Sequence, residues 1–423
     1  MNAGKIYTLF VLCFLCSIII LSTEGCKEET SLHSGAASTT PNRDQLNDSR
    51  FFQFVTRLTS LPVDSRKEYL HNFLEANPES PIIEKDSLAC FYFYGKASSV
   101  LINGDIQSGW SNPDSMDMIG CGDENFFYKI YSLPSDTRID YQLIVDGKTI
   151  TDPRNATITP SGFGYHSQCA MPFFIPNSIK DFRSNIGRGK VDSLFFKSKK
   201  TSVQQRMIKV YTPAGYEQTS NIPTLYVNDG YKAIEYCSYV NVLNNLIADK
   251  KIAPVIVVFI QYQDNDETFF IEKPEDYITA ICDELVPLIE TRYKTSSSPR
   301  NRAISGISAG AHISILTVLE RPDVFLNAAG QSTTITTKLF DAINKSSSNE
   351  SIRKSLRFYF DVGRFDLISG GLDNYTFLYA NQLIDKEMTK VGINHTFKIY
   401  NDGHQWANWR ERVDKLLIYL FGI

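Results

Sequence analysis

The feature that most constrains the fold of this chain is an alternation of apolar, β-branched runs with helical patterns after residue 206. Strands read as near-continuous apolar runs when helices cover both faces of a parallel sheet. We expect strands at residues 207–211, 224–227, 255–260, 302–305, 358–362 and 396–400. The helical patterns between them span residues 236–248, 275–293, 309–320 and 376–390. The alternation predicts a doubly wound α/β domain over residues 176–423.

The pentapeptide Gly306-Ile307-Ser308-Ala309-Gly310 follows one of these predicted strands and opens a predicted helix. Strand, G-x-S-x-G and helix together are the context of a nucleophile elbow, in which a strained turn raises the serine hydroxyl above the sheet. Bulky side chains two positions to either side would collide with neighbouring backbone, so both flanks must be small. A plain turn is the alternative interpretation of the pentapeptide taken alone.

Three more loops carry polar or glycine residues directly after predicted strands. They contain Gly230, Asp366 and His404. In open α/β sheets, sites form beyond the carboxyl ends of the strands, which meet at one edge. The chain order Ser308, Asp366, His404 is that of an α/β-hydrolase triad. We therefore predict that these residues converge at one edge of the sheet.

The predicted triad suits acyl transfer. A serine hydroxyl is a poor nucleophile at neutral pH, so His404 would take the proton of Ser308 and then protonate the leaving alcohol. Asp366 would hold the imidazole tautomer and stabilise the imidazolium. The amide of Ala309, with an amide at Gly230 or Tyr231, would form the oxyanion hole.

Other histidines and acids compete less well for these roles. His312 lies four residues beyond Ser308 on the same predicted helix, so we expect it to pack beneath the elbow. Asp361 lies within a predicted strand, and Asp402 is close to His404 in sequence. Asp373 stays open as a substitute acid.

The hydrophobic period changes to two between about residues 87 and 174, where Gly, Asn, Asp and Pro separate the runs. Short alternating strands with frequent turn signals favour an antiparallel sandwich. We expect strands at residues 89–94, 99–103, 126–131 and 139–145. A small all-β domain is therefore predicted over residues 81–175. A helical segment over residues 47–80 precedes it, with two helices meeting at Leu61-Pro62.

The N-terminus has the pattern of a targeting segment. Lys5 precedes an apolar run over residues 6–22, which Gly25-Cys26 closes. This resembles a bacterial lipoprotein signal, so we predict a signal peptide over residues 1–26 and lipidation of Cys26, with ordinary cleavage or an uncleaved anchor as alternatives. Residues 27–46 are predicted to be a flexible tether. We expect export to the outer membrane or cell surface, with the periplasm as the alternative.

Composition excludes several classes of partner. The net charge is −4, from 43 basic and 47 acidic residues, and no basic stripe stands out, so nucleic acid is not expected. No zinc-ligand spacing appears, and we expect neither a metal nor a cofactor. Five cysteines follow Cys26. They are expected to be buried thiols, with Cys90 and Cys169 as the one pair to test for a disulfide.

Several segments resemble the esterase D or enterochelin esterase-like family of α/β-hydrolases. The matching pieces are residues 225–230 (LYVNDG), 306–310 (GISAG), 321–325 (RPDVF) and 403–410 (GHQWANWR). Residues 101–105 with Trp110, and residues 141–147 with Asp152-Pro153, resemble the immunoglobulin-like early-set domain that precedes the esterase in such proteins. The helical piece at residues 50–77 also has a counterpart there, so the resemblance covers nearly everything after residue 47.

The resemblance implies a serine carboxylesterase whose serine, histidine and acid fall on Ser308, His404 and Asp366. Members of the family cleave catecholate siderophore trilactones, hydroxycinnamoyl esters of plant polysaccharides and simpler acyl esters. An ester of one of these classes is therefore the expected partner. The alternative is a catalytically inactive surface lipoprotein that binds a glycan or a siderophore.

Three residues near the predicted triad are candidates for substrate binding. Phe365 and Trp406 are candidates for the wall of an aromatic acyl pocket, with a packing role as the alternative for each. Arg364 is a candidate partner for an anionic substrate group, with a structural ion pair as its alternative. Asp229 is expected to orient the glycine loop.

Overall fold

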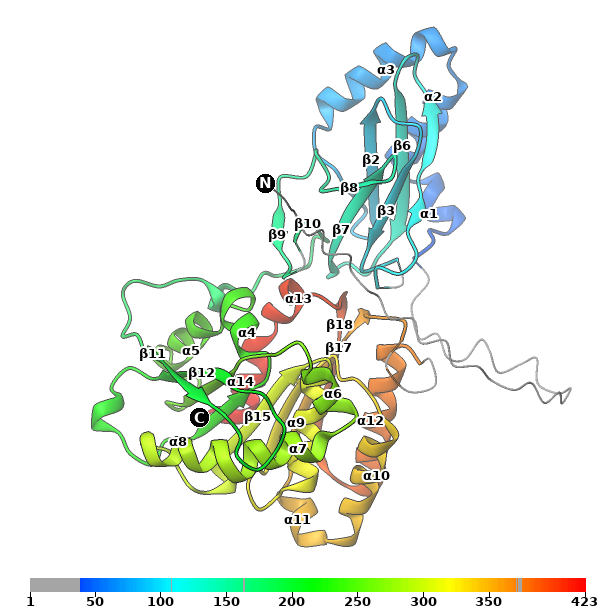
Figure 1. The fold of residues 1–423 in the computed structure, drawn as a ribbon. Coiled ribbons are helices and arrows are strands. Elements are labelled where there is room, and N and C mark those ends of the chain that lie inside the picture. The colour runs from blue at the N-terminus through cyan, green and yellow to red at the C-terminus, as the bar shows by residue number, and fades with distance from the viewer. Residues whose placement is uncertain (1–38, 108, 163, 370, 372–374) are drawn as a thin grey trace, which may run out of the picture. The chain divides into compact units, whose positions relative to one another are not determined.

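The computed structural model describes most of the chain beyond the N-terminus (Figure 1), at residues 39–107, 109–162, 164–369, 371 and 375–423. These residues belong to one compact unit. The predicted signal peptide, including Cys26, lies outside the described residues. Within the described ranges, no helix is long and apolar enough to span a membrane.

The end of the predicted tether is helical instead. Helix α1 (Arg43–Asn47) begins at a capping box, in which the Asn42 side chain accepts from the Gln45 amide and the Gln45 side chain accepts from the Asn42 amide. The Gln45 Nε2 also donates to Ser132 Oγ at 2.9 Å. These bonds satisfy amides that a free segment would leave to water, so the helix begins before the predicted boundary at residue 47.

Helices α2 (Arg50–Ser60) and α3 (Val63–Ala76) meet at Leu61-Pro62, as predicted. The Ser49 hydroxyl caps α2 by accepting from the Phe52 amide. The apolar faces of both helices pack with strands of the all-β part in one buried cluster, which includes Phe51, Phe54, Val55, Leu58, Leu70, Leu74, Leu88, Cys90, Tyr92 and Phe126.

The all-β part consists of two antiparallel sheets, with strand orders β1-β2-β6-β5 and β4-β3-β7-β10-β9, and β8 pairs with β7. The strands are β1 (Ile82–Glu84), β2 (Leu88–Gly95), β3 (Val100–Gly104), β4 (Asp114–Ser115), β5 (Asp117–Gly120), β6 (Asn125–Ser132), β7 (Arg138–Val145), β8 (Lys148–Ile150), β9 (Ile158–Pro160) and β10 (Tyr165–Ala170). Side chains of both sheets share one buried core, for example Phe91 and Phe127 with Ile102 and Leu143. All four predicted strands are confirmed within two residues of their predicted limits.

The α/β part is built on an eight-stranded sheet with the order β11-β12-β14-β13-β15-β16-β17-β18. Its strands are β11 (Lys190–Phe196), β12 (Arg206–Thr212), β13 (Thr224–Val227), β14 (Ile256–Ile260), β15 (Arg302–Ile307), β16 (Asn327–Gln331), β17 (Arg357–Phe365) and β18 (Asn394–Gly403). Strand β12 is antiparallel to both of its neighbours, and the pairs from β14 to β18 are parallel. The parallel strands therefore end at one common edge.

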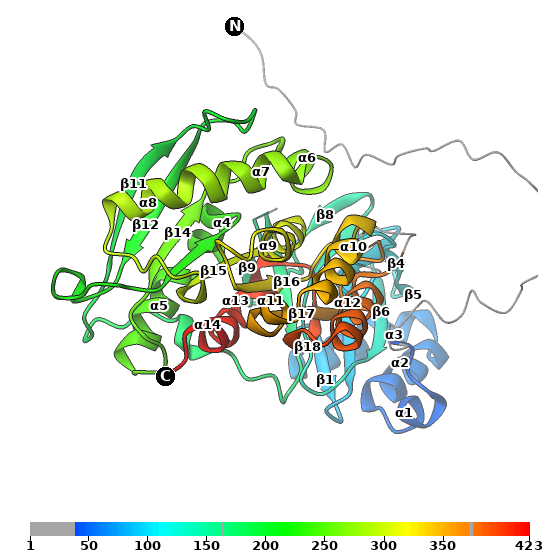
Figure 2. The same cartoon turned by 90° about the horizontal axis from the view of Figure 1, so that it is seen from below.

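Helices cover both faces of this sheet (Figures 1 and 2). They are α4 (Gly230–Tyr236), α5 (Tyr239–Ala248), α6 (Asp266–Ile271), α7 (Pro274–Ala280), α8 (Val286–Arg292), α9 (Ala309–Glu320), α10 (Thr337–Lys345), α11 (Glu350–Ser355), α12 (Phe377–Val391), α13 (Trp406–Arg410) and α14 (Val413–Phe421). A five-residue π-helical turn joins α7 to α8 within the single predicted helix. The predicted helix at 236–248 instead divides at Ser238, whose φ is 52°.

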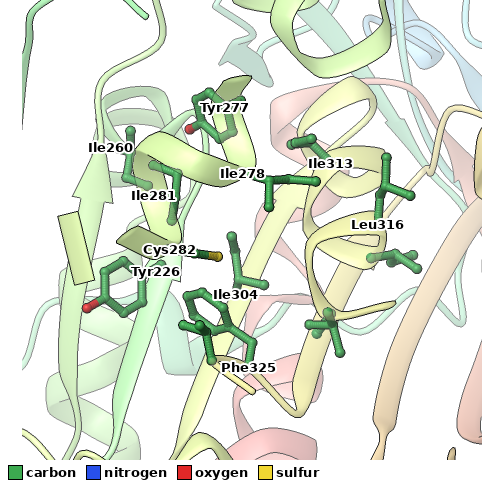
Figure 3. Packing of buried hydrophobic residues seen from close by; sticks show 14 of the residues in the cluster. Tyr226, Ile260, Tyr277, Ile278, Ile281, Cys282, Ile304, Ile313, Leu316 and Phe325 are labelled. Carbon is green, nitrogen blue, oxygen red and sulfur yellow. The ribbon is translucent and has the colours of Figure 1, made fainter. Parts of the chain in front are cut away.

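Strand residues alternate between two buried clusters. Tyr226 and Ile304 face the side that carries α7, α8, α9, α10 and α12, and Figure 3 shows Ile278 and Ile313 directed toward this core. Leu225 belongs to the opposite core, with α4, α5, α13 and α14. Burial of both faces is the reason that these strands are continuously apolar, and the predicted doubly wound architecture is confirmed.

Candidate active site

Ser308 lies between β15 and α9 in a strained backbone turn, with φ 54° and ψ −120°. Residues with side chains seldom adopt this conformation, and it marks functional turns. A Cβ atom at Gly306 would lie 2.4 Å from the carbonyl carbon of Gly310, and one at Gly310 would lie 2.8 Å from Asp229 Oδ2. The backbone therefore has the geometry predicted for a nucleophile elbow, and the collision that requires small flanks is visible.

The glycine loop after β13 is tied to the elbow helix by Asn228. The Asn228 Nδ2 donates to Ser314 Oγ at 2.9 Å, and Asn228 Oδ1 accepts from the Tyr277 hydroxyl at 2.7 Å. A Cβ atom at Gly230 would lie 2.5 Å from the Cα of Phe259, so only glycine fits where α4 passes over β14. The buried amide of Asn228 thus holds this loop against α9.

The three amides predicted to form the oxyanion hole all lie in the first turn of a helix. Gly230 and Tyr231 open α4, and Ala309 opens α9. Amides in a first helical turn have no acceptor within their own helix and point toward the helix N-terminus. The position of these amides is thus compatible with an oxyanion hole, which stays a prediction. The side chain of Tyr231 has a separate contact, with its ring centroid 4.1 Å from Lys209 Nζ.

Asp366 and His404 form a close pair beyond β17 and β18. The His404 Nδ1 lies 2.5 Å from Asp366 Oδ1, and Asp366 is buried. Burial opposes ionisation of Asp366, but His404, the Ser332 hydroxyl and the Leu367 amide together lower the pKa of this carboxyl below its ordinary value. An ionised Asp366 holds the proton on Nδ1 of His404, which leaves Nε2 as the nitrogen able to accept a proton.

Three residues that received no role from the sequence contact this pair. Ser332 follows β16, and its hydroxyl donates to Asp366 Oδ2 at 2.6 Å while accepting from Trp409 Nε1 at 3.0 Å. The Trp409 ring also packs edge-on against His404, with 4.7 Å between ring centroids, and Phe377 packs on His404 at 4.9 Å. The imidazole is therefore oriented by contacts on its ring as well as by the carboxylate.

The three candidate substrate-binding residues have structural contacts. Phe365 is buried in the core of the all-β part, which favours the packing alternative for this residue. Trp406 is buried, with its ring centroid 6.0 Å from that of Tyr236 in α4, and it packs edge-on against Trp409. Arg364 donates from Nε to Asn401 Oδ1 at 2.7 Å, a hydrogen bond to an amide and not the ion pair that was its alternative.

Of the competing titratable residues, the nearest to Ser308 in sequence is His312. His312 is buried beneath the elbow, and burial lowers its pKa to about 4, which keeps the ring neutral as expected for a packed residue. Asp373 lies outside the described residues. In the described part of the chain, Cys90, Cys121, Cys169, Cys237 and Cys282 are buried free thiols. No group of three or more His, Cys, Asp or Glu side chains in that part is arranged to hold a metal ion.

The strand order, the helices on both faces, the elbow and the acid–histidine pair together define this chain as an α/β-hydrolase. The model of a family described as "Putative esterase" matches residues 200–420, just over half of the 423 residues. The chain therefore belongs to this esterase family, among the carboxylic-ester hydrolases.

The chain is also similar to individual proteins. The chain is 31% identical over 203 residues to an endo-1,4-β-xylanase/feruloyl esterase of Xylanibacter ruminicola, which covers 44% of this chain and only 27% of the relative. The chain thus spans about a quarter of that relative. It is 23% identical over 236 residues to an uncharacterised protein of Bacillus subtilis, covering 54% of this chain and 96% of the other.

Two solved structures share the fold over most of the chain. The enterobactin esterase of Shigella flexneri, crystallised in the presence of enterobactin, has a TM-score of 0.64 at 17% identity, with 80% of this chain and 94% of that chain covered. The ferric enterobactin esterase of Salmonella typhimurium has a TM-score of 0.65 at 16% identity, with 83% and 98% covered. At these identities the likeness shows a common fold.

Proposed function

We propose that this protein is an exported serine esterase that hydrolyses carboxylic esters through a Ser308–His404–Asp366 triad and an acyl-enzyme. The single observation that carries the proposal is the 2.5 Å contact between His404 Nδ1 and buried Asp366, at the sheet edge where the elbow presents Ser308. Such a pair supplies the base that a serine hydroxyl needs in order to react at neutral pH.

The reaction proceeds in two halves. Ser308 Oγ attacks the ester carbonyl carbon while His404 Nε2 takes the hydroxyl proton, and the amides of Ala309 and of Gly230 or Tyr231 receive the oxyanion. The tetrahedral intermediate collapses, the C–O bond to the alcohol breaks, and His404 returns the proton to the leaving oxygen. Water, deprotonated by His404, then attacks the acyl-enzyme, and release of the acid restores the Ser308 hydroxyl.

The substrate class we propose is that of an enterochelin esterase-like or a feruloyl or acetyl esterase-like enzyme. Support comes from the names of the relatives: the Xylanibacter relative is a xylanase/feruloyl esterase, and the enterobactin esterases share the fold. The substrate would therefore be a siderophore ester, a polysaccharide-linked ester or a small acyl ester.

Hydrolysis by wild type and Ser308→Ala tests the function. A short p-nitrophenyl ester, a feruloylated oligosaccharide, an acetylated glycan and a ferric catecholate trilactone would be offered to both proteins. We expect the variant to lose about 10³-fold or more of the turnover on the preferred ester. Equal rates for the two proteins on every ester would favour the inactive binding protein instead.

We also propose that the all-β part is an immunoglobulin-like domain and that Cys26 carries a lipid anchor at the outer membrane or cell surface. The two packed antiparallel sheets support the first proposal, and the apolar run before Gly25-Cys26 supports the second. Metabolic labelling with an alkyne fatty acid should mark wild type and not Cys26→Ser, and equal labelling would contradict the anchor.

A further inference from the structure

Asp105 of the all-β part is a buried carboxylate with an unusually complete set of donors. It follows β3 and is 1% exposed. It accepts hydrogen bonds from Trp110 Nε1 at 2.8 Å, from the Asp140 amide at 2.9 Å and from Asn408 Nδ2 at 3.0 Å. The third donor belongs to α13, the short helix that begins two residues after His404. A carboxylate of the all-β part is thus bonded to the helix that follows the candidate catalytic histidine.

The same carboxylate touches the residue before His404. A Cβ atom at Gly403 would lie 2.3 Å from Asp105 Cγ and 2.5 Å from Asp105 Oδ1. The Asp105 side chain therefore packs directly on the Gly403 backbone, at a distance that no other residue at 403 would allow. The path of the chain into His404 depends on this contact.

Asn408 fixes the chain after His404. It is fully buried, and its Oδ1 accepts from Arg138 Nη1 at 2.5 Å while its Nδ2 donates to Asp105. Arg138 is itself held by Asp140 at 2.7 Å. Donor and acceptor atoms of the Asn408 amide therefore cannot exchange places. Trp409, the next residue, packs on the His404 ring, so a shift of Asn408 would move the imidazole.

We propose that Asp105 is a positioning residue for catalysis, because it braces the chain on both sides of His404. It contacts Gly403 before the histidine and Asn408 after it. This inference rests on the proposed function. It makes the all-β part a component of the active site, a role separate from the binding of a ligand. Because misplacement of a reacting group by about 1 Å can cost ~10²-fold in rate, loss of the brace should lower kcat.

Asp105→Asn tests the brace without a change in volume. In either orientation the new amide nitrogen would face a donor, Trp110 Nε1 on one side or Asn408 and Asp140 on the other, so we expect kcat to fall about 10- to 100-fold with KM nearly unchanged. The swapped pair Asp105→Asn with Asn408→Asp restores a donor facing an acceptor and keeps the acceptor for Arg138. It should recover at least part of the lost kcat. A wild-type kcat in D105N would overturn the proposal.

A matched control separates positioning from loss of stability. Leu143 is buried in the core of the all-β part, and Leu143→Ala should lower thermal stability while leaving kcat at the wild-type value below the unfolding temperature. Equal kcat losses in L143A and D105N would overturn the positioning role. If D105N does not fold, the single variant Asn408→Asp sets two carboxylates against each other and should show the same loss of kcat.

A readout independent of turnover distinguishes failure of the brace from failure of the proposed function. The Nδ1–H proton shared by His404 and Asp366 should give a far-downfield proton NMR signal in wild type. We expect this signal to shift or broaden in D105N and to be unchanged in L143A. If wild type hydrolyses no ester, the proposed function fails while this comparison still tests the brace. An identical signal in wild type and D105N would contradict it.

Discussion

Asp229 shows how one carboxyl can serve the backbone of the site and still cost stability. It adopts φ 55°, a conformation that Asn and Asp tolerate better than most residues, and its side chain lies against Gly310 of the elbow. Burial, with a smaller contribution from Asp266, raises the pKa of Asp229 to about 7, although Lys232 opposes this. The folded protein therefore keeps a proton that the unfolded chain releases near pH 4.

Asp229→Asn should consequently stabilise the protein at high pH. Between the ordinary pKa near 4 and the folded pKa near 7, wild-type stability falls as pH rises, because only the unfolded state has lost its proton. Asparagine cannot ionise and tolerates the same φ. After allowance for partial exposure, we expect a gain of about 2 kcal/mol at pH 8 relative to the difference at pH 4. Urea unfolding at both pH values measures it, and a pH-independent difference would contradict the assignment.

At the scale of elements, the predictions that succeeded rest on patterns with a clear physical cause. Strand β13 has the predicted limits because its four residues are all buried between helices. Strand β16, Asn-Ala-Ala-Gly-Gln, was not predicted, because it has no branched residue. Helix α9 packs too close to this strand for large side chains. Strand β11 was not predicted either, because it is an edge strand with mostly exposed residues and its apolar run is only the three residues 194–196.

In the candidate site too, residues that follow a predicted strand were found, and a residue that follows an unpredicted strand was not. Ser308, Asp366 and His404 were predictable because each follows a strand that the hydrophobic pattern reveals. Ser332 was missed because it follows β16. Trp409 lies within the recognised histidine motif, but its bond to Ser332 joins residues 77 positions apart, which a single sequence does not reveal.

Gly330→Val tests the close approach of β16 and α9. A Cβ atom at Gly330 would lie 2.9 Å from Thr333 Oγ1 and 3.0 Å from Ala311 Cβ, so valine must push the helix from the strand. We expect a loss of about 1–3 kcal/mol of unfolding free energy, measured by urea denaturation. Gly120→Val is the control, because a Cβ atom there meets only Asn125 Oδ1 at 3.7 Å, and it should change stability little. Equal effects would argue against tight packing at β16.

At the scale of the whole molecule, side chains of the α/β part pack into the all-β part. Phe365 is the last residue of β17 and is buried in the core of the all-β part. Asn177, in the segment that connects the two parts, donates from its amide to Glu411 Oε2 at 2.8 Å and from Nδ2 to Asp414 Oδ1 at 2.8 Å. Shared burial of this kind predicts that the described residues unfold as one cooperative unit.

Phe365→Ala tests this coupling by calorimetry. Wild type should show a single heat-absorption peak, and the variant should show one peak at lower temperature, because loss of a buried phenyl ring costs about 3–5 kcal/mol. Two separate peaks in wild type would contradict the coupling. A variant that lowers only one of two resolved transitions would show that Phe365 stabilises one part alone.

The most direct test of the central claim is the reaction of the protein with a fluorophosphonate, followed by intact mass and peptide mapping. We predict one phosphonyl group per chain, attached to Ser308, with no adduct on Ser308→Ala and much slower labelling of His404→Ala. His395→Ala is the matched control, because His395 pairs with Asp385 away from the elbow, and it should label at the wild-type rate. Absence of an adduct in wild type, or an adduct on a residue other than Ser308, would contradict the assignment of Ser308 as the nucleophile.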